Sequence, residues 1–268
     1  MTNEQMTKSP LDRIGALFET GHAALMPYFP LGFPDAVTSL DVIVAMSEAG
    51  ADAFEIGLSF SDPLADGPVI QHATQVALER GITVKRSLAM IAELRARGVT
   101  QPFLVMGYTN PILAYGQERF VADAAAAGAD GFIVPDLPPE EAGELDQLCQ
   151  ARGLGLIYFL APTSTAERVK LVAGKARGFI YLVSIAGVTG ARSQLAGGLS
   201  DFVGRIRQAT STPIAVGFGV STPDQARAVS QIADGVIVGS ALVQIVDRAA
   251  DKPRAAAEFI RQLKAGMR

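Results

Sequence analysis

The stretch from residue 54 to residue 68 combines an apolar, strand-like run with three acidic side chains. Glu55 stands inside the apolar run, and Asp62 and Asp66 follow in a loop that contains proline and glycine. Burying a carboxylate costs free energy unless the group is paired or used. Carboxylates in different environments can serve as acid and base in proton transfer. The stretch therefore predicts acid–base chemistry, although turn or helix capping is the simpler interpretation of either aspartate alone.

Short apolar runs alternate with amphipathic stretches along the whole chain, which predicts parallel strands separated by helices. The predicted strands cover residues 24–29, 53–57, 103–107, 131–134, 156–160, 179–183, 214–217 and 235–239. The predicted helices cover residues 39–49, 84–97, 118–127, 139–152, 165–174, 199–209, 222–230 and 241–249. This alternation predicts an α/β protein with a closed (β/α)8 TIM barrel. A doubly wound open sheet is the alternative, but no glycine-rich dinucleotide turn follows the first strand.

An extra helix is predicted ahead of the first strand, over about residues 10–20. Ser9 would cap it and Pro10 would occupy its first position. Such a helix could cover the bottom of the barrel. No linker, low-complexity tract or change of composition divides the chain, so we expect residues 1–268 to form one domain.

The composition argues against several functional classes. Of the 268 residues, 49% are hydrophobic and 19% are charged, and the net charge is −4. Interspersed charges of both signs give no basic surface for nucleic acid or for an anionic membrane. No apolar run approaches the ~20 residues that span a bilayer. Cys149 is the single cysteine and residues 1–5 do not resemble a secretory signal, so we expect a cytoplasmic protein.

Strand alternation orients the candidate groups. Within residues 53–57, Phe54 and Ile56 are predicted to face the helices, so Glu55 faces the mouth of the barrel, where barrels of this kind carry out chemistry. A structural carboxylate paired with an arginine is the alternative, but no arginine lies in a neighbouring predicted strand. Tyr181 could join Glu55 at the mouth, and a tyrosine that only fills the barrel is the alternative.

Glycine-rich turns follow the last three predicted strands and could bind a phosphate through backbone N–H groups. They are Gly187-Val188-Thr189-Gly190, Gly217-Phe218-Gly219 and Gly239-Ser240. Phosphate sites after the seventh and eighth strands are frequent in this fold. Apolar side chains near the same rim predict an apolar half-pocket, for which core packing is the alternative. They are Tyr28, Phe60, Tyr108, Ile133 and Phe218.

Other reaction classes lack their residues in this sequence. Every lysine falls outside the ends of the predicted strands, so a Schiff-base mechanism has no amine. His22 and His72 lie far apart and outside any metal-ligand spacing. Cys149 lies on a predicted helix, which favours a small core residue over a nucleophile. Carboxylate chemistry on a phosphorylated compound with an apolar portion remains.

The acidic stretch closely resembles the signature of the tryptophan synthase alpha chain family. The matching residues are Glu55-Ile56-Gly57 and Phe60-Ser61-Asp62-Pro63-Leu64-Ala65-Asp66-Gly67-Pro68. Residues 27–34, 106–111, 135–138, 187–190 and 217–220 are similar to the other loops of the family, in the same order. The resemblance spans nearly the whole chain.

This resemblance implies a lyase that splits indole-3-glycerol phosphate into indole and glyceraldehyde 3-phosphate by a retro-aldol step. Glu55 matches the principal acid–base residue of the family, and Asp66 matches the carboxylate that accepts from the indole nitrogen. Tyr181 matches a supporting tyrosine of the active site. The phosphate is expected to bind at Gly190, Gly219, Gly239 and Ser240. The indole is expected to lie against Tyr28, Met106, Ile133 and Phe218. Thr189 is expected to orient the aspartate loop.

The resemblance also implies a partner. The family forms an alpha2-beta2 heterotetramer, in which indole passes through a tunnel to a beta chain that uses pyridoxal phosphate. We expect the beta chain to contact the loops around Asp62 and around Asn110-Pro111, and we expect no cofactor or metal in this chain. Two departures from the family pattern, Leu58-Ser59 and Ser184-Ile185-Ala186, replace no proton-transfer group but bear on loop closure and subunit contacts.

Three other functions stay open at this point. A phosphate-binding barrel isomerase or epimerase would also use a glutamate and glycine turns, but it would not need the loop of Asp66. A stand-alone lyase that releases free indole would keep every catalytic residue named above. A non-catalytic subunit that only activates the beta chain would be expected to lose Glu55 or Asp66, and both are present.

Overall fold

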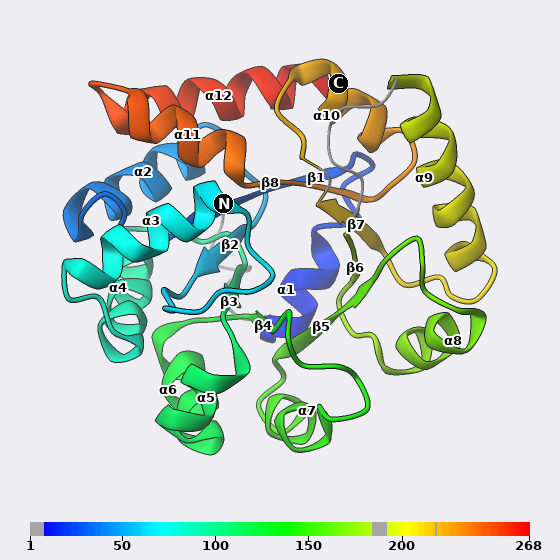
Figure 1. The fold of residues 1–268 in the computed structure, drawn as a ribbon, viewed down its shortest axis with the longest axis horizontal. Coiled ribbons are helices and arrows are strands. Elements are labelled where there is room, and N and C mark those ends of the chain that lie inside the picture. Colours follow the sequence, from blue (N-terminus) through cyan, green and yellow to red (C-terminus); the bar gives the residue numbers. More distant parts are fainter. Residues whose placement is uncertain (1–7, 184–191, 218) are drawn as a thin grey trace.

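The computed structural model describes residues 8–183, 192–217 and 219–268. Its strands are parallel and close into a barrel in chain order, from β1 to β8 and back to β1, as predicted (Figure 1). The strands are β1 (Ala24–Pro30), β2 (Phe54–Gly57), β3 (Phe103–Met106), β4 (Gly131–Ile133), β5 (Gly155–Leu160), β6 (Ile180–Val183), β7 (Ile214–Gly217) and β8 (Gly235–Val238). Every predicted strand agrees with an observed one to within one residue at either end.

Helices surround the barrel on all sides in Figure 1. Several begin after a side chain that caps the first turn, such as Asp35, whose carboxylate accepts from the N–H of Thr38. The outer helices are α2 (Ala36–Glu48), α3 (Pro68–Glu79), α4 (Val84–Ala96), α5 (Thr109–Tyr115), α6 (Gln117–Ala127), α7 (Gly143–Gln150), α8 (Ala166–Lys175), α9 (Arg192–Arg207), α10 (Pro223–Ser230), α11 (Ser240–Arg248) and α12 (Lys252–Gly266).

The helices differ from the prediction in number and in several boundaries, and α2 begins at Ala36 rather than at 39. The prediction of one helix per connection was wrong, because α3, α5 and α12 share a connection or the chain end with another helix without disturbing the order of strands. α7 begins at Gly143, since residues 139–142 form a turn first. α9 begins at Arg192 rather than at 199, because Gly197 and Gly198, which weaken a helix prediction, lie inside the helix.

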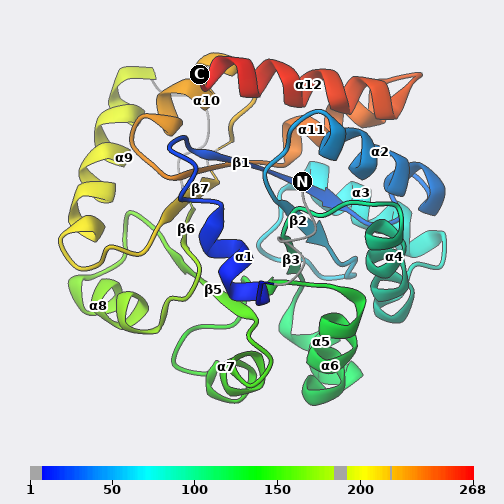
Figure 2. The same cartoon turned by 180° about the vertical axis from the view of Figure 1, so that it is seen from behind.

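The predicted N-terminal helix is present as α1 (Pro10–Ala16), which ends earlier than expected. The hydroxyl of Ser9 accepts from the N–H of Asp12, and Pro10 takes the first helical position. Figure 2 shows α1 lying across one end of the barrel. Ile14 is fully buried there among the side chains that fill the barrel. The helix therefore closes the barrel at the end where the strands begin.

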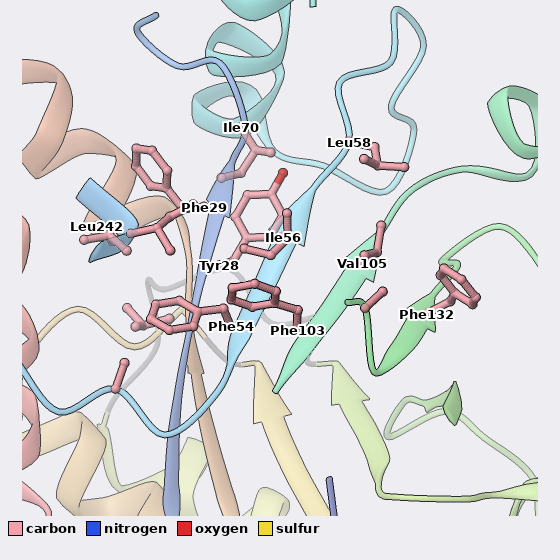
Figure 3. Packing of buried hydrophobic residues seen from close by; sticks show 14 of the residues in the cluster. Tyr28, Phe29, Phe54, Ile56, Leu58, Ile70, Phe103, Val105, Phe132 and Leu242 are labelled. Carbon is pink, nitrogen blue, oxygen red and sulfur yellow. The ribbon is translucent and has the colours of Figure 1, made fainter. Parts of the chain in front are cut away.

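Two separate apolar layers define the inside and the outside of the sheet. Phe54 and Ile56 belong to the core between strands and helices, where the Phe54 ring lies 6.0 Å from that of Phe103 (Figure 3). The side chains on the other face of the strands fill the barrel interior, together with side chains at and just after α1. They are Ile14, Leu17, Ala24, Met26, Ala53, Leu104, Ile133, Ile157, Phe179, Tyr181, Ala215 and Ile237. Because side chains alternate along β2, Glu55 points into the barrel interior, opposite to Phe54 and Ile56.

Three aspartates occupy equivalent junctions just before or at the start of β2, β4 and β8, and we call them the junction aspartates. Each carboxylate accepts a hydrogen bond from the N–H of a residue near the start of the preceding strand, and each aspartate N–H donates to the carbonyl of that same residue. The pairs are Asp52 with Leu25, Asp130 with Phe103 and Asp234 with Ile214, at 2.7, 2.8 and 2.7 Å from the carboxylate.

Asp130 also joins α1 to the barrel through two arginines. Its carboxylate is fully buried and lies 2.5 Å from Arg13 and 2.8 Å from Arg95, whose side chains are each 12% exposed. Removing one partner from a buried ion pair leaves charge that the interior does not compensate. The charge of Asp130 is therefore expected to matter for stability.

Asp130→Asn is expected to lower the free energy of unfolding by about 3–5 kcal/mol, because two largely buried guanidinium groups lose their negatively charged partner. Urea denaturation of both proteins at neutral pH measures the difference. Asp41→Asn is the matched control, since Asp41 pairs with Arg97 at the surface and such pairs contribute up to about 1 kcal/mol. Equal effects of the two substitutions would contradict the role assigned to Asp130.

Candidate active site

A cavity of about 740 Å³ opens at the end of the barrel opposite α1, where the strands end. Its wall brings together residues that lie far apart in the chain, from β1, β2, β3, β6 and the loops after β2, β7 and β8. Of the predicted site residues, the following line it: Tyr28, Glu55, Asp66, Met106, Tyr181, Gly219, Gly239 and Ser240. The described lining contains two carboxylates and neither lysine nor arginine.

Glu55 is held on the inner face of β2, paired in register with Tyr28 on β1 and with Leu104 on β3. The residue is only 1% exposed, and its Oε1 atom has no hydrogen-bond partner. Burial raises the pKa of this carboxyl well above its usual value, and the nearby charge of Asp66 raises it further. Within the described ranges no arginine pairs with it. A carboxyl in this setting holds a proton readily and can donate it.

Asp66 reaches the cavity from the loop between β2 and α3. Its Oδ2 accepts a hydrogen bond of 2.9 Å from the hydroxyl of Tyr108. Burial raises the pKa of Asp66, and the hydrogen bond from Tyr108 opposes that effect. The two carboxylates of the cavity therefore differ in environment, because Asp66 has a hydrogen-bond donor and the Oε1 atom of Glu55 has no partner.

Tyr28 and Tyr181 lean over glycines of the neighbouring strands. A Cβ atom at Gly57 would lie 2.4 Å from the Tyr28 hydroxyl, and one at Gly217 would lie 2.4 Å from the Tyr181 hydroxyl. Figure 3 shows the ring of Tyr28 next to Ile70, which also lines the cavity. Burial raises the pKa of both phenols, so both remain protonated hydroxyls.

Gly217→Ala is expected to reduce catalytic turnover strongly while the barrel stays folded, because the added methyl group displaces the Tyr181 ring that lines the cavity. Steady-state turnover and thermal unfolding of the purified variant measure the two effects. Gly174→Ala is the control, since a Cβ at that position in α8 meets nothing within 4 Å. Unchanged turnover in Gly217→Ala would show that the position of Tyr181 is unimportant.

The predicted phosphate-binding turns after β7 and β8 both reach the cavity. Gly239 caps α11 and Ser240 begins it, so the free N–H groups and the positive end of the helix dipole lie at the cavity wall. Gly219 has a φ of 60°, a conformation that favours glycine. The described lining contains no cationic side chain, so the donors there for an anion are backbone N–H groups and the neutral side chains of Ser221, Ser240 and Gln244. Thr189, Gly190 and Phe218 lie outside the described residues, as does the Ser184-Ile185-Ala186 departure.

Ile133 differs from the other predicted wall residues that the structure describes, because its side chain does not line the cavity. Ile133 is the last residue of β4, in register with Met106 of β3, but its side chain is fully buried in the barrel interior and is not among those that line the cavity, so its contact with a ligand stays a prediction. Phe159, which was not predicted, does line the cavity, and the centroid of its tilted ring lies 4.8 Å from that of Tyr181. Alternation along β5 could have found it. Ile70 and Gln244 also line the cavity from helices, for which strand alternation gives no signal.

The predicted partner residues lie outside the cavity wall. Asp62 and Asn110 are exposed, and Pro111 is half-buried at the start of α5.

Cys149 is fully buried, and burial raises the pKa of its thiol to about 12, which makes a thiolate nucleophile unfavourable. In the part of the chain that the structure describes, no cluster of three or more His, Cys, Asp or Glu side chains could bind a metal ion, and no helix has the length and apolarity needed to cross a membrane.

Two carboxyl groups of unequal environment share a cavity at the strand ends of a (β/α)8 barrel, beside a helix N-terminus that suits an anion. This arrangement is typical of barrel enzymes that use acid–base chemistry. The sequence model of the family described as tryptophan synthase alpha chain matches residues 15–268. The chain belongs to this family, as its sequence motifs predicted.

Similar proteins support this assignment along nearly the full chain. The tryptophan synthase alpha chain of Chloroflexus aurantiacus is 52% identical over 245 residues, which are 91% of this chain and 92% of that protein. The one from Roseiflexus castenholzii is 48% identical over 255 residues, with 94% and 98% covered. A crystal structure of the alpha chain from Legionella pneumophila superposes with a TM-score of 0.88 at 33% identity, covering 97% and 98% of the two chains.

A structure of tryptophan synthase from Mycobacterium tuberculosis also superposes, with a TM-score of 0.87 at 40% identity and with 96% and 98% covered. The tryptophan synthase alpha chain is the lyase component that cleaves indole-3-glycerol phosphate to indole and glyceraldehyde 3-phosphate, and it pairs with a beta chain. The predicted retro-aldol function is therefore confirmed at the level of the family.

Proposed function

We propose that Glu55 and Asp66 carry the proton transfers of the retro-aldol cleavage. Breaking the carbon–carbon bond requires a proton on the indole ring carbon, withdrawal of the ring N–H proton and loss of the side-chain hydroxyl proton. Glu55 donates to the ring carbon and accepts from the hydroxyl, while Asp66 accepts from and stabilises the ring nitrogen. Tyr181 supports these groups. The observation that carries the proposal is the buried Glu55 carboxyl with an unpartnered oxygen in the cavity wall.

Substrate binding is divided between two sides of the cavity. The phosphate group accepts from the N–H groups of Gly219, Gly239 and Ser240, a role supported by their place at the start of α11 and after β7. Tyr28 and Met106 lie against the indole. By their resemblance to the family, Gly190 adds to the phosphate site, Phe218 adds to the indole wall, and Thr189 orients the loop of Asp66.

The partner is a tryptophan synthase beta chain, in an alpha2-beta2 complex. The contacts are the loops of Asp62 and of Asn110-Pro111. Exposed apolar side chains on the same two segments support this, because Leu64 is 91% exposed and Leu113 is 53% exposed. Pyridoxal phosphate belongs to the beta chain alone, and this chain needs neither cofactor nor metal. The 268 residues act as one domain, in the cytoplasm.

The test is indole release from indole-3-glycerol phosphate by the purified chain, with and without a tryptophan synthase beta chain. Slow release that rises sharply with the partner is the expected result, because binding at the two loops shifts the cavity toward its closed state. Fast release that ignores the partner would support the stand-alone lyase. No release under either condition would overturn the proposed residue roles and return the barrel isomerase to consideration.

A further inference from the structure

Tyr108 makes two hydrogen bonds that meet at the loop of Asp66. The residue follows β3, is 4% exposed and was predicted only as part of an apolar wall. Its hydroxyl donates to Asp66 Oδ2 at 2.9 Å and accepts from the N–H of Ala65 at 3.1 Å. One oxygen atom thus holds both the backbone and the side chain of the catalytic loop.

The Tyr108 ring is itself fixed on two sides. The ring of Phe60 lies 5.5 Å from it, within the same loop that carries Asp66. The next residue, Thr109, donates from its N–H and its hydroxyl to Asp136, at 2.9 and 3.0 Å. The loops after β2, β3 and β4 are therefore connected through Tyr108 and its neighbour, so the hydroxyl has little freedom to leave Asp66.

We propose that Tyr108 is a positioning residue, which anchors the loop of Asp66 and keeps its carboxylate ionised so that it can accept the indole N–H proton. This inference rests on the role proposed above for Asp66. A carboxylate that accepts hydrogen bonds is stabilised in its charged form. Tyr108 acts through Asp66 and is assigned no contact with the substrate.

The surroundings of Asp66 make this hydrogen bond consequential. Burial raises the pKa of Asp66, and the Tyr108 hydroxyl is the group that lowers it. The other titratable groups facing this region are Glu55 on β2, Tyr28 on β1 and Tyr181 on β6. Burial raises the pKa of the Tyr108 phenol, the charge of Asp66 raises it further and Asp136 adds a smaller rise, so the phenol stays a donor. None of these groups is a cation that could replace Tyr108.

The experiment compares Tyr108→Phe with Tyr115→Phe, each measured as the full chain with a saturating beta chain. Tyr115 is the matched control, because its hydroxyl also donates to a carboxylate, Asp123 at 2.7 Å, but outside the cavity. Both variants keep the ring and lose one hydroxyl. The readouts are the pH profile of kcat, the KM for indole-3-glycerol phosphate, and the titration of the Asp66 carboxyl carbon by NMR, assigned with Asp66→Asn.

Tyr108→Phe is expected to lower kcat by roughly 10-fold or more, as for loss of a hydrogen bond to a charged group, with little change in KM. The acidic limb of its pH profile and the Asp66 titration should both move to higher pH, by about 1 pH unit. Tyr115→Phe should match the wild type in all three. A merely structural role for Tyr108 would leave the pH profile in place.

The outcomes separate this inference from the proposed function. If Asp66→Asn retains near-full activity, the role of Asp66 is wrong and the inference falls with it. If Asp66→Asn is inactive but Tyr108→Phe keeps the wild-type pH profile and Asp66 titration, the inference alone is overturned. A shift of both readouts in Tyr108→Phe, with none in Tyr115→Phe, supports it.

Discussion

Glu55→Gln is expected to lower indole release from indole-3-glycerol phosphate by roughly 10²–10⁴-fold, the contribution typical of a positioned acid or base. Glutamine keeps the size of the side chain but can neither donate to the ring carbon as an acid nor accept the hydroxyl proton. Because the Oε1 atom of Glu55 has no partner, the amide breaks no hydrogen bond at that atom. Steady-state release with the beta chain present is the measurement.

The same substitution should change the pH dependence of stability in a defined direction. The folded protein holds the Glu55 proton more tightly than the unfolded chain does, because the pKa is raised on folding. The carboxyl therefore makes the free energy of unfolding fall as pH rises from the ordinary glutamate pKa toward the raised folded value. Glu55→Gln lacks this loss, so the variant should gain stability relative to the wild type across that interval.

Glu93→Gln serves as the control for indole release. Glu93 lies on α4 at the surface, where it pairs with Arg97 and is 49% exposed. We expect this variant to release indole at the wild-type rate. Near-full turnover in Glu55→Gln would remove Glu55 from the mechanism, whatever its effect on stability.

Asp66→Asn is expected to lower kcat by about 10²-fold or more, because an amide cannot take up the indole N–H proton or offset the charge that develops on the ring. The amide oxygen can still accept from Tyr108, so the loop should keep its conformation. The loss should therefore fall on kcat, with a smaller effect on KM. Single-turnover cleavage of indole-3-glycerol phosphate separates the chemical step from product release.

Asp41→Asn is the corresponding control. Asp41 lies on α2, is exposed, pairs with Arg97 and does not line the cavity. Its kcat should equal that of the wild type. A higher KM with unchanged kcat in Asp66→Asn would assign Asp66 to substrate binding and remove it from the chemical step. If Asp66→Asn lost folded structure as well as activity while Asp41→Asn kept both, the expectation that the loop of Asp66 keeps its conformation would be wrong.

The alternation of apolar runs with amphipathic stretches was sufficient to predict the barrel, and period-two alternation within the second strand predicted the inward direction of Glu55. The strand boundaries were accurate because each apolar run ends at a glycine, a proline or a polar loop. Helices were predicted less well. The prediction missed α3, which follows the acidic loop directly, and α12, which follows α11 after a short break. A count of strands predicts one helix for each connection and cannot reveal a second one.

The contact between Asp66 and Tyr108 shows where sequence reasoning stopped. The two residues are 42 positions apart, and Tyr108 lies beyond the end of β3, where alternation no longer fixes the direction of a side chain. Ile133 shows another limit. It stands at the end of β4 as the sequence predicts, in register with Met106, but a place at the end of a strand does not decide whether a side chain lines the cavity or is buried beside it.

The junction aspartates have a consequence for how the chain can be divided. Each closes one strand–helix–strand unit on itself, joining residues 27, 27 and 20 positions apart. These hydrogen bonds lie at the end of the barrel opposite the cavity, so they are independent of the loops that bind substrate and partner. A unit that recombination of the gene transfers whole therefore keeps the hydrogen bonds between its two strands, whereas the ion pairs of Asp130 with Arg13 and Arg95 reach outside residues 103–130 and depend on the rest of the barrel.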